Sequence, residues 1–380
     1  MAKTDTTLTS LKALLGPIRP LLENPDVSDI LVYGSKSIYA KRRGKGFERE
    51  PEIKWDNDKE LFAAADMIGI NMGRPLSENN PILDARLPDG SRVNIVVEPC
   101  YNKGACITIR KFPEERFTLE DIAGFGTIDQ NGMDILKIFM EYGRNIIVAG
   151  GTGSGKTTLL NALCGYIPKH DIVVTCEDAR EISVPCELWV ALETKHSLDE
   201  KYKPITLTKL IQASLRQNPR WIIVGEVRGA EALDLIRAFN TGHHGIGTLH
   251  SINAIGALTA LEMMSLQGES KIPLLAIKMM IVDAIQIVIH IDNFSDHSRR
   301  ITEIIEITGL DYGKSEDMPP YKYRTLYKFE MQGYDYDKKQ FIGRHEIKEP
   351  PTWVNELIHL PTVTIPDFWK NAPDNPKFVE

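Results

Sequence analysis

The stretch GGTGSGKT, from Gly150 to Thr157, constrains the fold of this chain more than any other. It matches the pattern G-x-x-x-x-G-K-[ST], whose glycines let the backbone wrap closely around a phosphate chain. An apolar run at 145–149 (NIIVA) precedes it and is typical of a buried strand, and TLLNAL at 158–163 predicts the start of a helix. The strand, loop and helix that the motif requires are therefore all present, and they predict a nucleotide triphosphate site in an α/β fold.

Two side chains of this loop have the chemistry to meet the nucleotide. Lys156 would reach the β- and γ-phosphates, and the Thr157 hydroxyl would bind Mg²⁺. The loop amides and the helix N-terminus would add partial positive charge. The residues expected to bind the nucleotide are Gly150, Gly151, Thr152, Gly153, Ser154, Gly155, Lys156, Thr157 and Thr158.

Length and charge narrow the class of protein. A chain of 380 residues suggests about two domains. Its net charge of −7 and pI of about 5.8 give no support to a broad nucleic-acid-binding surface, so we expect no direct binding of nucleic acid. Five cysteines without C-x-x-C spacing fit a reducing compartment and argue against a structural zinc site.

No segment has the pattern of a membrane anchor. Residues 1–16 lack the apolar core and cleavage site of a signal peptide. The longest apolar candidate, 273–291, is interrupted by Lys278, Asp283 and His290, so it predicts a globular helix and strand. We therefore expect the protein to reach a membrane only through partners.

The hydrophobic pattern divides the chain into regions. Residues 1–112 predict an α+β domain, 113–130 a linker, 131–300 an alternation of helices and strands, and 301–380 a β-rich extension. The alternation favours a mainly parallel sheet with helices on both faces. Helices are expected at 11–22, 61–70, 133–142, 207–215 and 230–239, and strands at 30–33, 37–40, 92–97, 106–110, 145–149, 172–175, 221–224, 246–249, 301–307, 323–330 and 341–347.

Three further stretches follow the phosphate loop and carry acidic or imidazole groups. In IIVGEVRG (222–229) an apolar strand ends in Glu226, where a carboxylate can hold Mg²⁺-bound water or orient the attacking water. CEDARE (176–181) crowds carboxylates at the end of another strand, at the sheet edge where ligands bind in open α/β folds. TGHHGIGTLH (241–250) places histidines at a glycine-rich strand, where they could sense the γ-phosphate. Solvated strand ends and structural histidines are the alternative interpretation of each.

In this order, the phosphate loop, acidic stretch, Gly-Glu-x-Arg-Gly element and histidine box resemble the type II/type IV secretion (traffic) ATPase superfamily, over about residues 25–360. The resemblance implies a hexameric ATPase on the cytoplasmic face of an inner membrane, where it powers pilus assembly, secretion or conjugation. It also implies a PAS-like N-terminal sensing domain and a RecA-like motor domain, with ATP between them.

The resemblance also assigns roles by position. Glu177 and Asp178 match an acidic pair near Mg²⁺ and water, Glu226 matches the Walker B glutamate, and His243 and His250 match the histidine box. The expected metal-binding residues are Thr157, Glu177 and Asp178. The expected catalytic residues are Glu226, Glu177, His250, His243, Arg86, Arg92 and Arg110.

The three arginines come from the N-terminal region. Arg86 and Arg92 lie in DARLPDGSRV (84–93) and Arg110 in ITIRKF (107–112), segments that resemble those supplying phosphate-facing arginines in this family. Arginine offers a permanently charged fork for developing phosphoryl charge. Surface arginines beside aspartates are the alternative.

Within the superfamily the chain looks most like the branch of tad/Flp-pilus assembly and conjugative type IV secretion ATPases. SENNPILDARLPDGSRVN (77–94), GEVRGAEALDLIRAFNTGH (225–243) and FEMQGYD (329–335) carry this likeness. NPRW at 218–221 departs from the Arg-Pro-Asp-Arg of that branch, and the short spacing between Gly245 and Thr248 is closer to pilus-retraction ATPases.

Taken together, the sequence predicts a Mg²⁺-dependent ATPase, peripheral to the cell membrane, whose partner is a membrane platform protein of a pilus or secretion machine. Pilus retraction and conjugative DNA transfer remain alternatives within the family. Two alternatives of another class also remain: a nucleotide-gated scaffold with little turnover, and a DNA-translocating motor.

Overall fold

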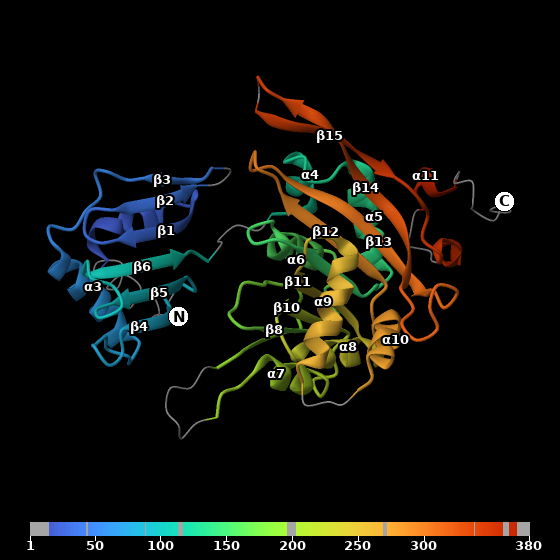
Figure 1. The fold of residues 1–380 in the computed structure, drawn as a ribbon, viewed down its shortest axis with the longest axis horizontal. Coiled ribbons are helices and arrows are strands. Elements are labelled where there is room, and N and C mark those ends of the chain that lie inside the picture. The colour runs from blue at the N-terminus through green and yellow to red at the C-terminus, as the bar shows by residue number, and fades with distance from the viewer. Residues whose placement is uncertain are drawn as a thin grey trace. The chain divides into compact units, whose positions relative to one another are not determined.

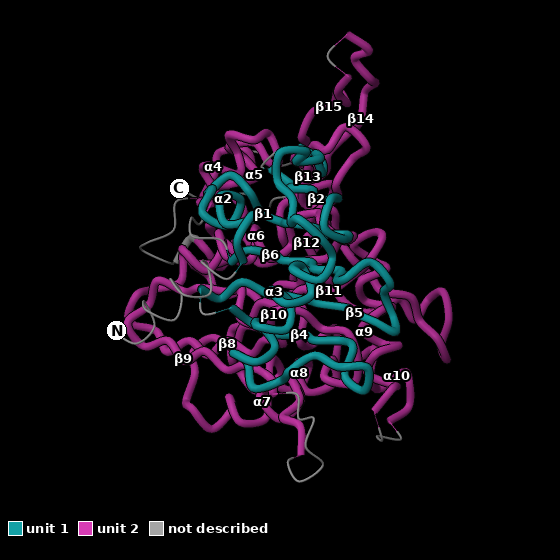
Figure 2. The backbone as a smooth tube through the Cα atoms, turned by 90° about the vertical axis from the view of Figure 1, so that its left-hand side faces the viewer, with its two compact units in different colours: residues 1–115 teal, residues 116–380 magenta. Residues whose placement is uncertain are grey.

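The computed structural model describes residues 15–42, 45–87, 89–112, 117–195, 203–268, 272–337, 339–359 and 365–370. The chain forms two compact units, Met1–Glu115 and Arg116–Glu380, which Figure 2 draws in different colours.

Unit 1 is built on a six-stranded sheet in the order β3-β2-β1-β6-β5-β4, in which every paired neighbour is antiparallel. One face of the sheet is apolar: in β5 the burial alternates residue by residue, as expected for a sheet covered on one side. Helix α3 packs on that face through Leu61 and Ile68, and its N-terminus is capped by Asn57. The elements are η1 (Gly16–Ile18), α2 (Arg19–Glu23), β1 (Val27–Tyr33), β2 (Ile38–Arg42), β3 (Phe47–Arg49), α3 (Asp58–Asn71), β4 (Ile82–Arg86), β5 (Arg92–Val97) and β6 (Ala105–Arg110).

Unit 2 is built on a nine-stranded sheet in the order β15-β14-β13-β12-β7-β11-β10-β8-β9. Strands β12, β7, β11, β10, β8 and β9 are parallel to their neighbours, whereas β13 to β15 continue the sheet as antiparallel strands. The strands are β7 (Ile146–Gly150), β8 (Val173–Glu177), β9 (Trp189–Glu193), β10 (Trp221–Val227), β11 (His244–His250), β12 (Ile287–Asn293), β13 (Arg299–Leu310), β14 (Tyr321–Asp335) and β15 (Gln340–Ile347).

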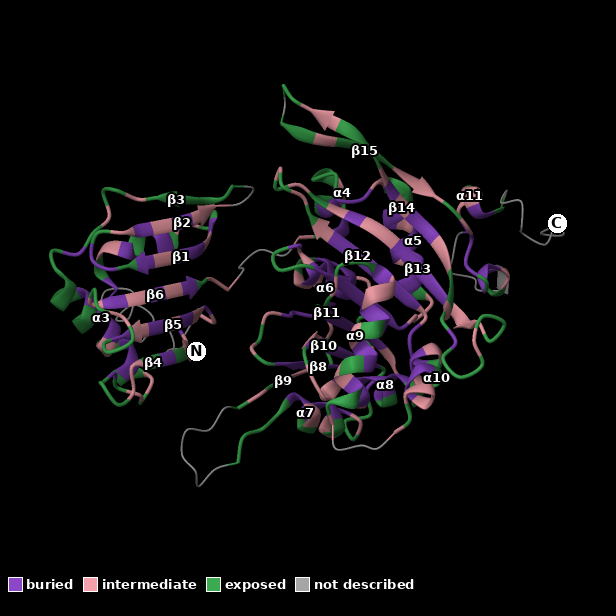
Figure 3. Ribbon diagram, in the orientation of Figure 1, coloured by how far each residue is buried: buried purple, intermediate pink, exposed green. Residues whose placement is uncertain are grey.

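Helices cover both faces of this sheet (Figure 1). Ile146 and Val148 of β7 pack in one core with α5 and α6, while Ile147 and Ala149 pack in the other with α7 to α10. Burial on both faces explains why the inner strand β7 is continuously apolar in sequence. Figure 3 colours the buried residues of this unit purple. The helices are α4 (Leu119–Gly124), α5 (Gln130–Glu141), α6 (Lys156–Cys164), α7 (Leu207–Ser214), α8 (Glu231–Asn240), α9 (Ala254–Leu266), α10 (Leu274–Ala284), η2 (Val354–His359) and α11 (Asp367–Lys370).

The predicted elements are present, and the structure differs from the prediction in three respects. The helix expected at 11–22 lies partly outside the described residues, and its remainder is a 3₁₀ turn and the short α2, because Pro17 and Pro20 interrupt it. The expected linker contains α4, which begins with a capping box between Thr118 and Asp121. Elements that were not predicted include β3, β4, β9 and α9, together with α4 and the short helices η2 and α11.

None of the helices in the described part of the chain is both long and apolar enough to cross a bilayer.

Candidate functional site

The phosphate-binding loop has the backbone that its glycines permit. It leaves the buried strand β7 at Gly150 and enters α6 at Lys156, and Gly153 and Gly155 have φ of +72° and +102°, which L side chains rarely adopt. A Cβ on Gly150 would lie 2.1 Å from the Ile291 carbonyl oxygen of the neighbouring strand β12. The loop therefore has the close-packed, left-handed geometry that presents amides to a phosphate chain.

Lys156 lies inside this loop and is only 8% exposed. Its ammonium group donates to the carbonyl oxygens of Gly150 at 3.0 Å and Gly151 at 2.8 Å. Burial lowers the pKa of Lys156, and the nearby carboxylate of Glu226 acts in the opposite direction. A phosphate group would supply the negative charge that this partly desolvated cation prefers.

His250 joins Lys156 to Glu226. The Lys156 Nζ lies 3.4 Å from His250 Nδ1, and His250 Nε2 lies 2.7 Å from Glu226 Oε1. Arg228 Nε donates to the other carboxylate oxygen of Glu226 at 2.8 Å. Strands β7, β11 and β10 are neighbours and parallel, so their carboxyl ends bring these residues to one edge of the sheet.

Glu177 ends β8 at the same edge and is 2% exposed. Its Oε1 accepts from the backbone amides of Glu181 at 2.7 Å and Ile182 at 2.8 Å, which fixes the turn that follows. A Cβ on Gly225 would lie 3.1 Å from Glu177 Cγ, so the glycine before Glu226 makes room for this side chain. Asn161 of α6 donates to the Glu181 carbonyl at 3.1 Å, which ties the acidic turn to the helix of the phosphate loop.

The remaining residues expected to bind metal lie near the surface. Asp178 is exposed and Thr157 is half-buried in the first turn of α6. Within the described residues no three His, Cys, Asp or Glu side chains converge as a ready metal cluster. This donor set fits Mg²⁺, which takes one or two protein oxygens together with phosphates and waters, better than it fits a metal held by an all-protein cage.

His243 is not brought to the phosphate loop. It precedes β11, at the amino end of the strand, whereas His250 ends the strand beside Gly150. Six residues of extended chain lie between the two histidines, which places them roughly 20 Å apart. His243 Nδ1 lies 3.1 Å from the Ala238 carbonyl oxygen and 3.0 Å from the Thr241 hydroxyl, contacts that close the end of α8.

The three N-terminal arginines form a row across the sheet of unit 1. Arg86 of β4 pairs in register with Arg92 of β5, and Arg92 pairs with Arg110 of β6. Residues in register on adjacent strands point to the same face about 4.8 Å apart, so the row concentrates positive charge at one end of the sheet. Arg110 Nε donates to Asp29 Oδ1 of β1 at 3.0 Å, which ends the row with a carboxylate.

Sequence reasoning missed one side chain at the phosphate loop. Arg299, which begins β13, donates from Nε to the Gly153 carbonyl at 3.1 Å. Its Cδ lies 3.2 Å from where a Cβ on Gly155 would stand. No motif surrounds Arg299, and it reaches the loop only because β12 and β13 form a hairpin beside β7.

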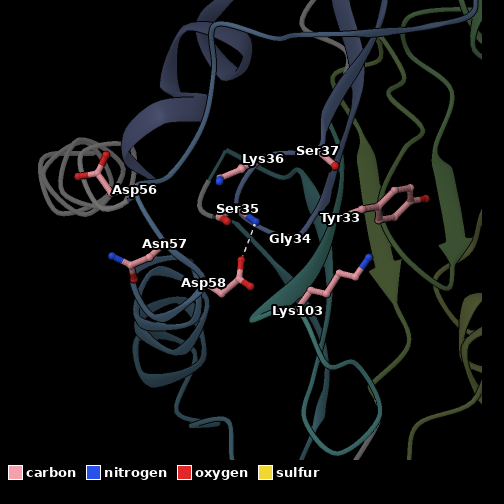
Figure 4. A pocket seen from close by; sticks show the side chains of 9 residues that line it. All are labelled: Tyr33, Gly34, Ser35, Lys36, Ser37, Asp56, Asn57, Asp58 and Lys103. Carbon is pink, nitrogen blue, oxygen red and sulfur yellow. Dashed lines mark hydrogen bonds between the residues drawn. The ribbon is translucent and has the colours of Figure 1, made fainter.

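Unit 1 also contains a cavity of about 400 Å³ between the β1–β2 turn and the start of α3 (Figure 4). Its polar groups largely bind one another: the Asp58 carboxylate accepts from the Ser35 amide at 3.1 Å, and Asn57 caps the first amides of α3. None of the predicted site residues lines it.

The chain belongs to the type II/IV secretion system protein family, whose model matches residues 12–349. The match extends over both compact units and includes all the residues assigned to the site.

Individual relatives come from bacteria and archaea. An uncharacterized protein of Methanocaldococcus jannaschii is 33% identical over 333 residues, covering 87% of this chain, which spans only 58% of that relative's length. The type IV secretion system protein PtlH of Bordetella pertussis is 31% identical over 78% of this chain and 95% of its own. The solved structure of the Legionella pneumophila ATPase DotB is similar in fold, with a TM-score of 0.51, 20% identity, and coverage of 82% of this chain and 80% of its own.

Proposed function

We propose that this protein hydrolyses ATP with Mg²⁺ and thereby powers a membrane-embedded machine, either a tad/Flp-like pilus assembly system or a type IV secretion system. The observation that carries the proposal is the row Lys156–His250–Glu226 beside a complete phosphate loop, in a member of a secretion-protein family. PtlH, named as a type IV secretion protein, and DotB, described as an ATPase, support it.

Each residue of the row has a task in phosphoryl transfer. The Lys156 ammonium exchanges its two carbonyl partners for the β- and γ-phosphate oxygens. The Glu226 carboxylate orients the attacking water and accepts its proton, while His250, at 2.7 Å, keeps one carboxylate oxygen in place.

Mg²⁺, when bound, would neutralise charge on the β- and γ-phosphate oxygens. The Thr157 hydroxyl would hold it, with Glu177 and Asp178 placed to bind its waters. Because Glu177 already fixes the turn through 182, its carboxylate is held in one position before any ligand arrives.

The row Arg86–Arg92–Arg110 supports a role for unit 1 in the reaction. Three guanidinium groups in register offer a polyvalent anion more than a single arginine does. We propose that residues 1–112 form a PAS-like sensing and oligomerisation domain that presents these arginines to ATP. Residues 113–130 link it to a RecA-like motor domain at 131–300, and residues 301–380 form a β-rich extension. Release of the arginines after hydrolysis would let the domains move as rigid bodies.

The assembly we propose is a ring of six copies at the cytoplasmic face of the membrane, bound to a platform protein of the machine. The site chemistry is common to pilus assembly, pilus retraction and conjugative transfer, so the machine has to be identified by the partner.

The experiment that tests the function compares wild type with Lys156→Ala for Mg²⁺-dependent ATP turnover, with particle mass measured by light scattering. We expect turnover from a particle of about six subunits, and a loss of at least roughly 100-fold in the variant, because the ammonium group neutralises transition-state charge. Lys169→Ala, which removes an exposed lysine outside the predicted site, is the control. A wild-type protein that binds ATP without turnover would favour the nucleotide-gated scaffold instead.

A further inference from the structure

A buried histidine, His290, lies behind the phosphate loop and has no part in the mechanism above. His290 is on β12, opposite Ala149 of β7, and is 5% exposed. Both nitrogens of its ring have partners: Nδ1 lies 2.6 Å from the Thr302 hydroxyl oxygen, and Nε2 lies 3.4 Å from the Ser251 carbonyl oxygen. His290 thus connects β13 to the residue that directly follows His250.

The two hydrogen-bond partners of His290 bear on which of its ring nitrogens carries the proton. A carbonyl oxygen only accepts, so the contact with Ser251 requires a proton on Nε2. Burial lowers the pKa of His290, which keeps the ring neutral near pH 7. Nδ1 is then the acceptor for the Thr302 hydroxyl, which also lies 3.3 Å from the His290 carbonyl oxygen.

The Ser251 carbonyl lies in the short connection between β11 and α9, directly after His250. Here β11 ends and α9 begins: the Ser251 hydroxyl donates to the Asn253 carbonyl at 2.8 Å, and Asn253 caps α9. The side chain of His250 is 46% exposed, so side-chain packing alone does not hold it between Lys156 and Glu226. Its position depends on the backbone that carries it.

We infer that His290 is a positioning residue: together with Thr302 it holds the Ser251 carbonyl and so places His250 between Lys156 and Glu226. This inference rests on the proposed function for its effect on turnover. A shift of about 1 Å at a catalytic group can cost roughly 100-fold in rate. A buried histidine that served only the stability of the core would lower the melting temperature and leave the kinetics of the folded protein unchanged.

The test uses two variants of His290 in the full chain. His290→Phe keeps a planar ring and removes both contacts, whereas in His290→Gln the amide can donate to Ser251 and accept from Thr302. We expect His290→Phe to lower kcat by about 10- to 100-fold with the KM for ATP within about twofold of wild type, and His290→Gln to recover most of kcat.

The matched control is His244→Phe. His244 is a half-buried histidine at the opposite end of β11, with its ring 5.1 Å from that of Trp221. We expect its substitution to leave kcat within about threefold of wild type. Equal kcat in wild type and His290→Phe would overturn the inference, as would a His244→Phe loss as large as that of His290→Phe.

Hydrogen exchange of the backbone amides at 250–256 gives a readout that needs no turnover. We expect faster exchange in His290→Phe, and exchange at the wild-type rate in His290→Gln and His244→Phe. If wild type fails to hydrolyse ATP, the proposed function fails, and the exchange rates alone then decide the role of His290: unchanged protection in His290→Phe overturns it.

Discussion

At the scale of single residues, the Glu226 carboxylate is held by two side chains, one on each oxygen. His250 contacts Oε1 at 2.7 Å and Arg228 contacts Oε2 at 2.8 Å, so both oxygens are engaged and the carboxylate is held rather than mobile. A carboxylate fixed in this way is suited to orienting water, since little reorganisation is needed when the reaction occurs.

Replacing Glu226 by Gln keeps the size of the side chain and its capacity to bind Arg228, but removes the base. We expect Glu226→Gln to bind ATP and to turn over about 100- to 10,000-fold more slowly than wild type. Steady-state turnover and the binding of a fluorescent nucleotide measure the two effects separately. Glu187→Gln, at a glutamate whose side chain is 74% exposed, is the control, and a Glu226→Gln variant with wild-type turnover would exclude the assigned role.

At the scale of elements, the sequence predicted best those segments in which local pattern and environment agree. The phosphate loop and the fully buried strands β7 and β10 were recognisable because their apolar runs end in residues of distinct chemistry. Strand β9 is half-buried and lies at the sheet edge, and its short apolar run (WVAL) was not recognised as a strand. Helix α9 has apolar residues all around it, so it lacks the amphipathic period by which helices are predicted.

The residues of the site, like the elements, could be predicted only where a local sequence motif marked them. Lys156, Glu226 and His250 each end or follow a strand of one parallel sheet, and the carboxyl ends of such strands share one edge, where the three residues meet. The contributions of Arg299 and His290 depend on the register of the β12–β13 hairpin, which no local motif specifies. His243 was predicted to belong to the site because it matches the histidine box of the family, but strand β11 separates it from His250.

Helices α9 and α10 are joined by a buried ion pair. Lys278 Nζ lies 3.2 Å from Glu262 Oε1, both side chains are about one-tenth exposed, and the ammonium group lies 4.5 Å from the centre of the Tyr321 ring. Lys278 also donates to the Pro319 carbonyl at 3.2 Å. The pair therefore joins the two helices to the start of β14.

Removing one partner of this pair should lower the free energy of unfolding more than removing both partners does. We expect Lys278→Met to lower the free energy of unfolding by about 3 kcal/mol or more, because it leaves the Glu262 carboxylate buried without its cation. The double variant Glu262→Leu/Lys278→Met should recover part of that loss. Urea denaturation of the three proteins gives the comparison, and a double variant less stable than Lys278→Met would show that the pair stabilises the helices outright.

At the scale of the whole molecule, the residues predicted to act on the nucleotide come from two units with separate hydrophobic cores. Unit 1 carries the arginine row on an antiparallel sheet, and unit 2 carries the phosphate loop on a largely parallel one. The family model spans both units, although only unit 2 contains the phosphate loop. The proposed motor function would use such a division, because energy released at one unit does mechanical work only if another responds to it.

A substitution in the arginine row tests whether unit 1 contributes to ATP hydrolysis. Arg92 is the middle member, in register with both Arg86 and Arg110. We expect Arg92→Gln to lower kcat by roughly 1,000-fold or more if the row acts as arginine fingers do in other phosphoryl-transfer enzymes, with less effect on the binding of ADP. Arg49→Gln is the matched control, since Arg49 lies on the opposite edge strand β3 of the same sheet and donates to the Lys36 carbonyl at 3.3 Å. Stopped-flow measurement of a single turnover separates the chemical step from product release. A single-turnover rate equal in Arg92→Gln and wild type would mean that unit 1 does not contribute charge to the reaction, and the coupling between the units would then have to arise from another part of the chain.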